Sequence, residues 1–175
     1  MPIDENRPFL PVSIAVLTVS DTRTEADDRS GDTLVERLKS VGHLLADRAI
    51  VKDDAGLIET QLRTWIDNPD IDCVIATGGT GVTGRDVTPE ALDRVCEKTS
   101  PGRGELFRWI SYQKIGGSTI QSRADAGVAK GTYLFVLPGS TGACRDGWDE
   151  ILVHQLDNRF RPCNFVELIP RLQER

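Results

Sequence analysis

The sequence has no concentrated positive charge. Its 21 lysine and arginine residues are outnumbered by 27 aspartate and glutamate residues, which gives a net charge of −6, and they form no basic run. Proteins that bind nucleic acid or anionic lipid carry a basic patch or arm. We therefore predict that DNA, RNA and membrane surfaces are not partners of this chain.

Long hydrophobic runs are missing as well. No apolar run approaches the roughly 20 residues that a membrane-spanning helix needs. Residues 1–20 lack the basic start, the apolar centre and the small-residue cleavage site of a signal peptide. These absences predict a cytoplasmic protein.

Cysteine and histidine are few and scattered. The four cysteines form neither a C-x-x-C redox pair nor a paired zinc-ligand pattern, which favours buried thiols. They are Cys73, Cys96, Cys144 and Cys163. His43 and His154 lie far from each other and from the motifs below, so neither is assigned a role.

Three short apolar runs, rich in β-branched residues, predict strands at residues 13–20, 72–77 and 132–138. Their apolar character is continuous rather than alternating, which is typical of strands covered on both faces in a parallel sheet. Residues 44–51 are a weaker strand candidate.

Helical spacing of apolar residues appears between these runs. The predicted stripes are Leu34, Leu38 and Val41; Ile58, Leu62, Trp65 and Ile66; and Trp148, Ile151, Leu152 and Leu156. Thr88 followed by Pro89 predicts a helix start with the threonine as cap. Alternating strands and helices in 175 residues predict a single α/β domain, a three-layer sandwich with a mostly parallel central sheet.

Residues 99–130 interrupt this alternation. We expect a helix at 104–115, a break at Gly116–Thr119 and a second helix within 120–129, all packed on the same domain.

The carboxyl ends of the predicted strands carry Gly, Ser, Thr and Asp. Parallel sheets bind ligands at that edge, so these four loops predict one anion-binding crevice, although turns favour the same residue types. The segments are TVSDT (18–22), VKDD (51–54), TGGTG (77–81) and LPGST (137–141).

Gly79, Gly81 and Gly84 have the G-x-G-x-x-G spacing of a dinucleotide-binding loop. A nicotinamide-dependent oxidoreductase is a weak alternative, because the predicted helix starts only at Pro89 and the acidic position about 20 residues on falls in helical sequence. A P-loop also fails, since no Gly-Lys-Ser/Thr follows.

Asp86 follows the glycines and would repel phosphate unless a divalent cation lay between them. Magnesium binds one or two carboxylates together with phosphate oxygens. The alternative is that Asp86 pairs with Arg85 or caps the turn. At the neighbouring strand end, Asp54 is the better helix cap, which leaves Asp53 available for metal.

These residues resemble the molybdenum cofactor biosynthesis protein B family, which is related to MogA and to the G domain of gephyrin. The resemblance covers nearly the whole chain, with a core of about residues 12–165. It runs from IAVLTVSDTR through ATGGTGVTGRDVTPEAL and GRGELFRWISYQKIGGSTIQSRADAGV to LPGSTGACRDGWDEIL and LDNRFRPCNF.

The resemblance implies a molybdopterin-binding fold whose active members transfer AMP from Mg-ATP to molybdopterin. Their product is then handed over for metal insertion. It implies that Asp53 and Asp86 are catalytic and bind Mg²⁺. The implied substrate-binding residues are Ser20, Asp21, Gly78, Gly79, Thr80, Gly81, Gly139, Ser140, Glu105 and Ser122. The alternative within the family is a non-catalytic molybdopterin-binding or carrier protein.

One position departs from the family pattern, which often has a lysine where this chain has Gly142. Arg145, Arg123 and Lys52 are the candidate replacements for that cation. The resemblance also implies a homohexamer made of trimers. Leu106, Phe107, Trp109 and Ile110 are the candidate apolar surface for it, with a well-buried helix as the alternative.

Overall fold

Strands and helices alternate along the first half of the chain in the computed structural model, which describes residues 3–174. The strands are β1 (Ser13–Val19), β2 (Leu44–Val51), β3 (Cys73–Thr77), β4 (Lys98–Thr99), β5 (Asp125–Ala129) and β6 (Thr132–Leu137). The α-helices are α1 (Arg29–Ser40), α2 (Ala55–Ile66), α3 (Thr88–Val95), α4 (Pro101–Ile115), α5 (Thr141–Gly147) and α6 (Val153–Gln155). Two 3-10 helices, η1 (Gly116–Gln121) and η3 (Val166–Arg171), and a π-helical turn, η2 (Trp148–Leu152), complete the elements.

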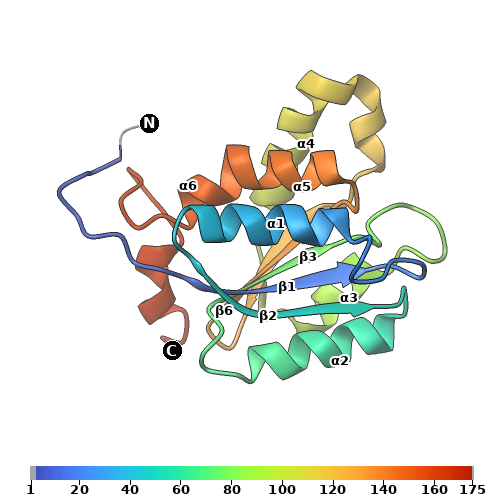
Figure 1. The fold of residues 1–175 in the computed structure, drawn as a ribbon, viewed down its shortest axis with the longest axis horizontal. Coiled ribbons are helices and arrows are strands. Elements are labelled where there is room, and N and C mark those ends of the chain that lie inside the picture. The colour runs from blue at the N-terminus through green and yellow to red at the C-terminus, as the bar shows by residue number, and fades with distance from the viewer. Residues whose placement is uncertain (1–2, 175) are drawn as a thin grey trace.

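The six strands form one sheet in the order β2-β1-β3-β6-β5-β4. Strands β2, β1, β3 and β6 are parallel, and β5 and β4 add an antiparallel edge. Helices α1, α4 and α5 cover one face, and α2 and α3 cover the other (Figure 1). The predicted three-layer α/β sandwich is confirmed.

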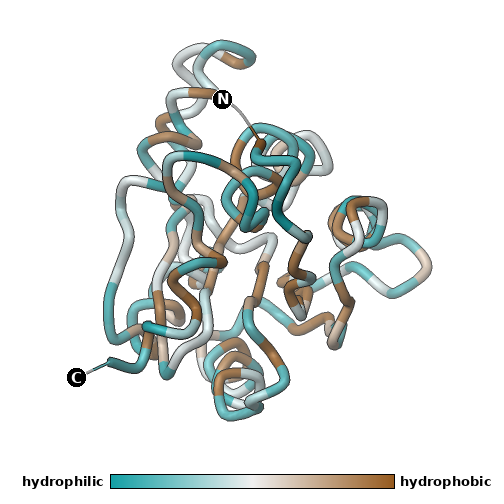
Figure 2. Tube along the Cα trace, turned by 90° about the vertical axis from the view of Figure 1, so that its left-hand side faces the viewer, coloured by the Kyte–Doolittle hydropathy of each residue, from teal (hydrophilic) through white to brown (hydrophobic). Residues whose placement is uncertain are grey.

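Burial on both faces explains the continuous apolar strands. In β1, Ile14 and Val16 pack under α1 and α5, whereas Ala15, Leu17 and Val19 pack against α2 and α3. Figure 2 shows hydrophobic stretches of the chain in the interior and hydrophilic residues on many of the outer turns. No helix within residues 3–174 is long and apolar enough to cross a bilayer.

The predicted strands and most predicted helices are confirmed, with two corrections at helix ends. Helix α1 ends at Ser40, so Val41 is 38% exposed and does not continue the buried stripe. Thr88 is the first residue of α3 and not its cap, because Val87 occupies the capping position. The Thr88 hydroxyl instead donates to the Gly78 carbonyl oxygen at 2.8 Å.

The second helix expected within residues 120–129 is wrong. This segment ends in β5, which pairs with β6 through a turn at Lys130 and Gly131, both at positive φ. A Cβ at Gly127 would lie 2.3 Å from Cys96 Sγ and 2.8 Å from the Lys98 carbonyl oxygen. The small residues that resembled a helix therefore allow a neighbouring strand to approach closely, and strand pairing overrides local propensity.

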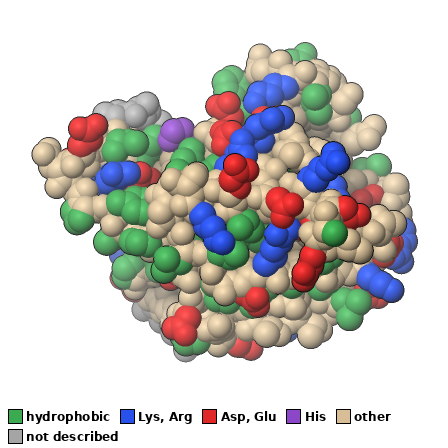
Figure 3. Space-filling model, viewed as in Figure 1, with side chains coloured by type: hydrophobic (Ala, Val, Ile, Leu, Met, Phe, Trp, Pro, Cys, Tyr) green, Lys and Arg blue, Asp and Glu red, His purple; other side chains and the backbone are tan. Residues whose placement is uncertain are grey.

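Helix α4 and η1 form a lobe that projects from the body of the molecule, with hydrophobic side chains on its surface (Figures 1 and 3). Leu106 and Trp109 are exposed, as predicted for an apolar surface. Phe107 is buried and turns inward, so its assignment to that surface is wrong. The self-association implied by family resemblance stays a prediction for solution mass to decide.

Candidate functional site

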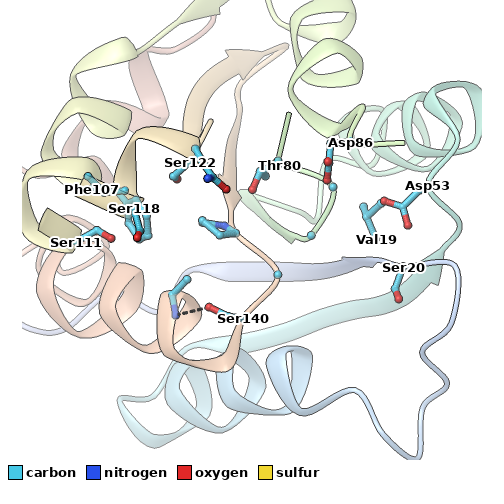
Figure 4. Close-up of a pocket in the computed structure, with 18 of the residues that line it drawn as sticks. Val19, Ser20, Asp53, Thr80, Asp86, Phe107, Ser111, Ser118, Ser122 and Ser140 are labelled. Carbon is cyan, nitrogen blue, oxygen red and sulfur yellow. Dashed lines mark hydrogen bonds between the residues drawn. The ribbon is translucent and has the colours of Figure 1, made fainter. Parts of the chain in front are cut away.

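A cavity of about 540 Å³ lies at the carboxyl ends of the parallel strands. Loops that follow β1, β2, β3 and β6 form one part of it, and α4 with η1 forms the opposite wall (Figure 4). The structure brings most of the predicted site residues together here. They are Ser20, Asp53, Gly78, Gly79, Thr80, Gly81, Asp86, Ser122, Gly139 and Ser140.

Two predicted site residues, Asp21 and Glu105, do not line the cavity. Asp21 is held outside it by Arg85, whose Nη2 lies 2.7 Å from Asp21 Oδ1, and it also accepts a 3.3 Å hydrogen bond from the Asp53 amide. Glu105 is exposed on α4. Asp21 therefore supports the loop that carries Asp53.

The glycine loop after β3 is fixed by long-range contacts. Gly78 and Gly79 have φ values of 103° and 61°, a region that favours glycine. The Gly78 amide donates to Leu137 O at 3.0 Å, and the Thr88 amide donates to Gly79 O at 3.0 Å. The loop is thus pinned to both β6 and α3 beside the cavity.

The third glycine of the dinucleotide pattern has no comparable role. Gly84 is exposed, a Cβ there would meet nothing within 4 Å, and α3 starts only at Thr88. The G-x-G-x-x-G match is therefore a coincidence of spacing, because the third glycine of that fingerprint serves close packing of helix and strand.

Asp86 combines a structural contact with a place in the cavity wall. Its Oδ2 accepts hydrogen bonds from the Thr83 amide at 2.9 Å and the Thr83 hydroxyl at 2.6 Å. The Thr83 hydroxyl is the main reason that the pKa of Asp86 lies below its ordinary value, so this carboxylate is ionised at neutral pH. The alternative in which Asp86 caps the turn is confirmed in part by its contacts with Thr83. The alternative in which it pairs with Arg85 is wrong, because Arg85 pairs with Asp21.

Asp53 has the opposite electrostatic setting. Burial, and next the negative charge of Asp21, raise the pKa of Asp53, and Asp86 adds to the effect. Asp54, by contrast, caps α2 by accepting a 2.9 Å hydrogen bond from the Leu57 amide, as predicted. Asp53 is thus the free carboxylate of the VKDD segment, and a cation beside it would relieve the repulsion from its acidic neighbours.

The two cavity carboxylates are a donor set that suits a magnesium ion whose remaining ligands come from substrate phosphates and water. Residues 3–174 contain no group of three or more His, Cys, Asp or Glu side chains placed to hold a metal. Magnesium commonly takes one or two carboxylates and fills its remaining positions with phosphate oxygens and water. Asp53 and Asp86 line the cavity from two different loops, and they are the two residues that would hold such an ion.

Sequence reasoning missed the wall formed by α4 and η1. Phe107 and Ile115 give this wall an apolar surface, while hydroxyl and amide groups add hydrogen-bonding capacity. The polar members are Ser111, Ser118, Thr119 and Gln121. The signal was present in the GELFRWISYQKI segment, whose apolar residues exceed one helical stripe. From the sequence, this excess predicts an outer surface or a well-buried helix, and not a cavity wall.

None of the three proposed replacements for the absent lysine lines the cavity. Arg123 holds the backbone of the glycine loop, since its Nε donates to Gly81 O and its Nη2 to Asp86 O, both at 2.7 Å. Arg145 and Lys52 are exposed outside the cavity. The sequence did not single out Arg23, which does line the cavity.

Comparison with known proteins gives consistent matches. A family model described as a probable molybdopterin binding domain matches residues 15–158. Molybdenum cofactor biosynthesis protein B of Escherichia coli (strain K12) is 49% identical over 157 residues, which cover 90% of this chain and 92% of that protein.

Solved structures agree with this match. A crystal structure of a molybdenum cofactor biosynthesis protein B is 37% identical with a TM-score of 0.87, and the alignment covers 97% of this chain and 100% of that one. The tungsten cofactor synthesizing protein MoaB from Pyrococcus furiosus is 35% identical with a TM-score of 0.74, over 82% of this chain and 92% of that one.

Proposed function

Because this chain belongs to the molybdenum cofactor biosynthesis protein B family, we propose that it transfers AMP from Mg-ATP to molybdopterin. A role in molybdenum cofactor biosynthesis follows from the family itself. The proposal adds the reaction, the two substrates and the residues that serve them.

The proposed reaction is a nucleotidyl transfer. An oxygen of the terminal phosphate of molybdopterin attacks the α-phosphorus of ATP and forms a phosphoanhydride. The bond from that phosphorus to the bridging oxygen of the β-phosphate breaks, and pyrophosphate leaves with its electron pair. Such a reaction demands alignment and charge stabilisation more than covalent chemistry from the protein.

The residues of the cavity divide these tasks. The glycine loop lines the site, and its amides other than that of Gly78 would hold the nucleotide phosphates, since backbone donors in such loops bind anions. Asp53 and Asp86 would hold magnesium, which when bound neutralises charge on the phosphates. The apolar wall with Phe107 and Ile115 would exclude water and pack on the pterin ring.

One observation carries the proposal. Asp53 and Asp86, which follow different strands and are separated by 32 residues in the sequence, line the same cavity as the glycine loop (Figure 4). Two carboxylates on opposite sides of the molecule could not share a metal ion. Two carboxylates without phosphate-binding N–H groups nearby would not form a site for a metal ion bound to a nucleotide. Their joint placement supports a metal-nucleotide site.

The test is incubation of the protein with molybdopterin and Mg-ATP, followed by assay of adenylylated molybdopterin and pyrophosphate. We expect both products in equal amounts, and a loss of about 100-fold or more in rate for Asp86→Asn. This variant retains a carbonyl acceptor for Thr83, so the loop is preserved while the charge is removed. Asp93→Asn, an exposed carboxylate on α3 outside the cavity, is the matched control and should keep the wild-type rate.

The contrary outcomes are equally specific. Retention of molybdopterin without release of pyrophosphate would identify a carrier protein and end the proposal of catalysis. A wild-type rate in Asp86→Asn would remove this residue from the magnesium site.

A further inference from the structure

Arg23 is the one lysine or arginine among the described residues that line the cavity. Its Nη2 donates to the Gly139 carbonyl oxygen at 2.8 Å, and its amide donates to the Ser20 hydroxyl oxygen at 3.2 Å. The side chain is 30% exposed, so it is neither buried nor free in solvent. Arg23 thus extends from the loop after β1 to the loop after β6.

A buried carboxylate holds Arg23 in this position. Asp28 has a side chain with 0% exposure, and its Oδ1 lies 3.7 Å from Arg23 Nη1. Asp28 is itself fixed by the Thr18 hydroxyl at 2.7 Å and the Gly31 amide at 3.0 Å, with Arg48 Nη2 also at 2.8 Å. Its charge is therefore a permanent part of the fold and orients the guanidinium next to Gly139.

The guanidinium retains capacity for a ligand. An arginine has five N–H donors, and within residues 3–174 the Arg23 side chain donates one hydrogen bond, to Gly139. Planar guanidinium donors match the oxygens of a phosphate in geometry as well as in charge. The remaining donors lie on a residue that lines the cavity.

The strand order separates this cation from the metal-binding end. Asp53 follows β2 and Gly139 follows β6, which are three strands apart in the sheet. Adjacent strands lie about 4.8 Å apart, so the ends of these two strands are separated by about 14 Å. Figure 4 accordingly shows Ser140 well away from Asp53. One cavity therefore offers the Asp53 carboxylate at one end and a fixed cation at the other.

We propose that Arg23 binds the phosphate monoester of the pterin substrate and replaces the cation absent at Gly142. A phosphate monoester can be bound by a protein cation directly, whereas the nucleotide phosphates are placed at the other end with their metal ion. The identity of this phosphate rests on the proposed function. The cavity is thus polarised, with the attacking phosphate at the Arg23 end and the leaving pyrophosphate toward Asp53.

The test is a titration of wild type and Arg23→Gln with molybdopterin, with its dephosphorylated form and with Mg-ATP. Glutamine keeps an N–H donor for Gly139 and removes the charge. Loss of one charged hydrogen-bonding partner should weaken the binding of molybdopterin by about 10-fold to 100-fold. Binding of the dephosphorylated pterin and of Mg-ATP should not change, and Arg23→Lys should recover part of the loss.

The matched control is Arg145→Gln, which removes an exposed cation near Gly142 that does not line the cavity. It should bind all three ligands like the wild type. Unchanged Mg-ATP binding by Arg23→Gln also shows that this variant is folded.

The outcomes separate this inference from the proposed function. If wild type binds molybdopterin more tightly than its dephosphorylated form, and Arg23→Gln loses this preference, the role of Arg23 is supported. If the same wild-type protein forms no adenylylated product, the proposed catalysis is wrong. If wild type turns over while Arg23→Gln binds molybdopterin as tightly, the inference falls and catalysis stands. Weaker binding of the dephosphorylated pterin, weaker binding of Mg-ATP alone, or absence of molybdopterin binding by wild type would each overturn the role of Arg23.

Discussion

Two carboxylates of one cavity have pKa values shifted in opposite directions because their immediate contacts differ. Asp86 accepts hydrogen bonds from Thr83, which lower its pKa, whereas burial and the charge of Asp21 raise the pKa of Asp53. A metal ion bound between them requires both to be ionised. Magnesium affinity should therefore fall with decreasing pH as Asp53, the weaker acid, takes up its proton.

The raised pKa of Asp53 also predicts how its removal affects stability. A carboxyl whose pKa is higher in the folded than in the unfolded protein destabilises the fold at pH values above both pKa values. Asp53→Asn should therefore have a Tm at neutral pH equal to or above that of wild type, while magnesium-dependent turnover falls by about 100-fold or more. Thermal unfolding and a rate assay check this pair of effects. A Tm several degrees lower would mean that Asp53 has a structural role instead.

The segment between β3 and α3 is the element on which the site depends most. Its first glycine has φ of 103°, and a Cβ there would lie 2.1 Å from the Val19 carbonyl oxygen of the neighbouring strand. Its last glycine, Gly84, faces open space. The same loop thus contains one glycine required by packing and one that is not.

This contrast predicts unequal effects of the same substitution. Gly78→Ala should lower the free energy of unfolding by more than about 2 kcal/mol, because a left-handed conformation and a backbone clash add together. Gly84→Ala should stay within about 0.5 kcal/mol of wild type, as surface substitutions commonly do. Urea denaturation measures both, and equal effects at the two positions would show that the loop is not held as described.

At the scale of the whole molecule, His43 joins the N-terminal segment to the core. It is 4% exposed, its Nδ1 accepts a 3.1 Å hydrogen bond from the Val12 amide, and its ring packs between Phe9 and Trp148. Burial lowers the pKa of His43 from 6.5 to about 4, although the charge of Asp157 acts in the opposite direction. The folded protein therefore holds this imidazole neutral.

The consequence is a loss of stability in acid. Between pH 6.5 and about 4 the unfolded chain binds a proton at His43 that the folded chain does not, so the free energy of unfolding falls as pH falls through that window. The loss has an upper bound of about 3 kcal/mol. His43→Gln keeps an acceptor for Val12 and should flatten this part of the curve of unfolding free energy against pH. An unchanged slope in that variant would assign the acid sensitivity to other groups.

Local signals were enough for much of this protein. Four strand positions, the buried stripe of α2 and the cap at Asp54 follow from patterns spanning a few residues, because they depend on burial and hydrogen bonds within one element. The glycines and acids at the strand ends were predicted for a different reason, since a parallel sheet brings its carboxyl ends to one edge. Family motifs then added the chemistry of the site.

Only the tertiary structure decided the contacts between distant segments. Pairing with β6 made a strand of residues 125–129, Arg85 drew Asp21 out of the cavity, and the return of α4 over the strand ends placed Phe107 in its wall. Arg23 reaches a carbonyl group 116 residues further along the chain. Periodicity and propensity report on neighbours in sequence, whereas these contacts exist only once the sheet order has set which loops meet.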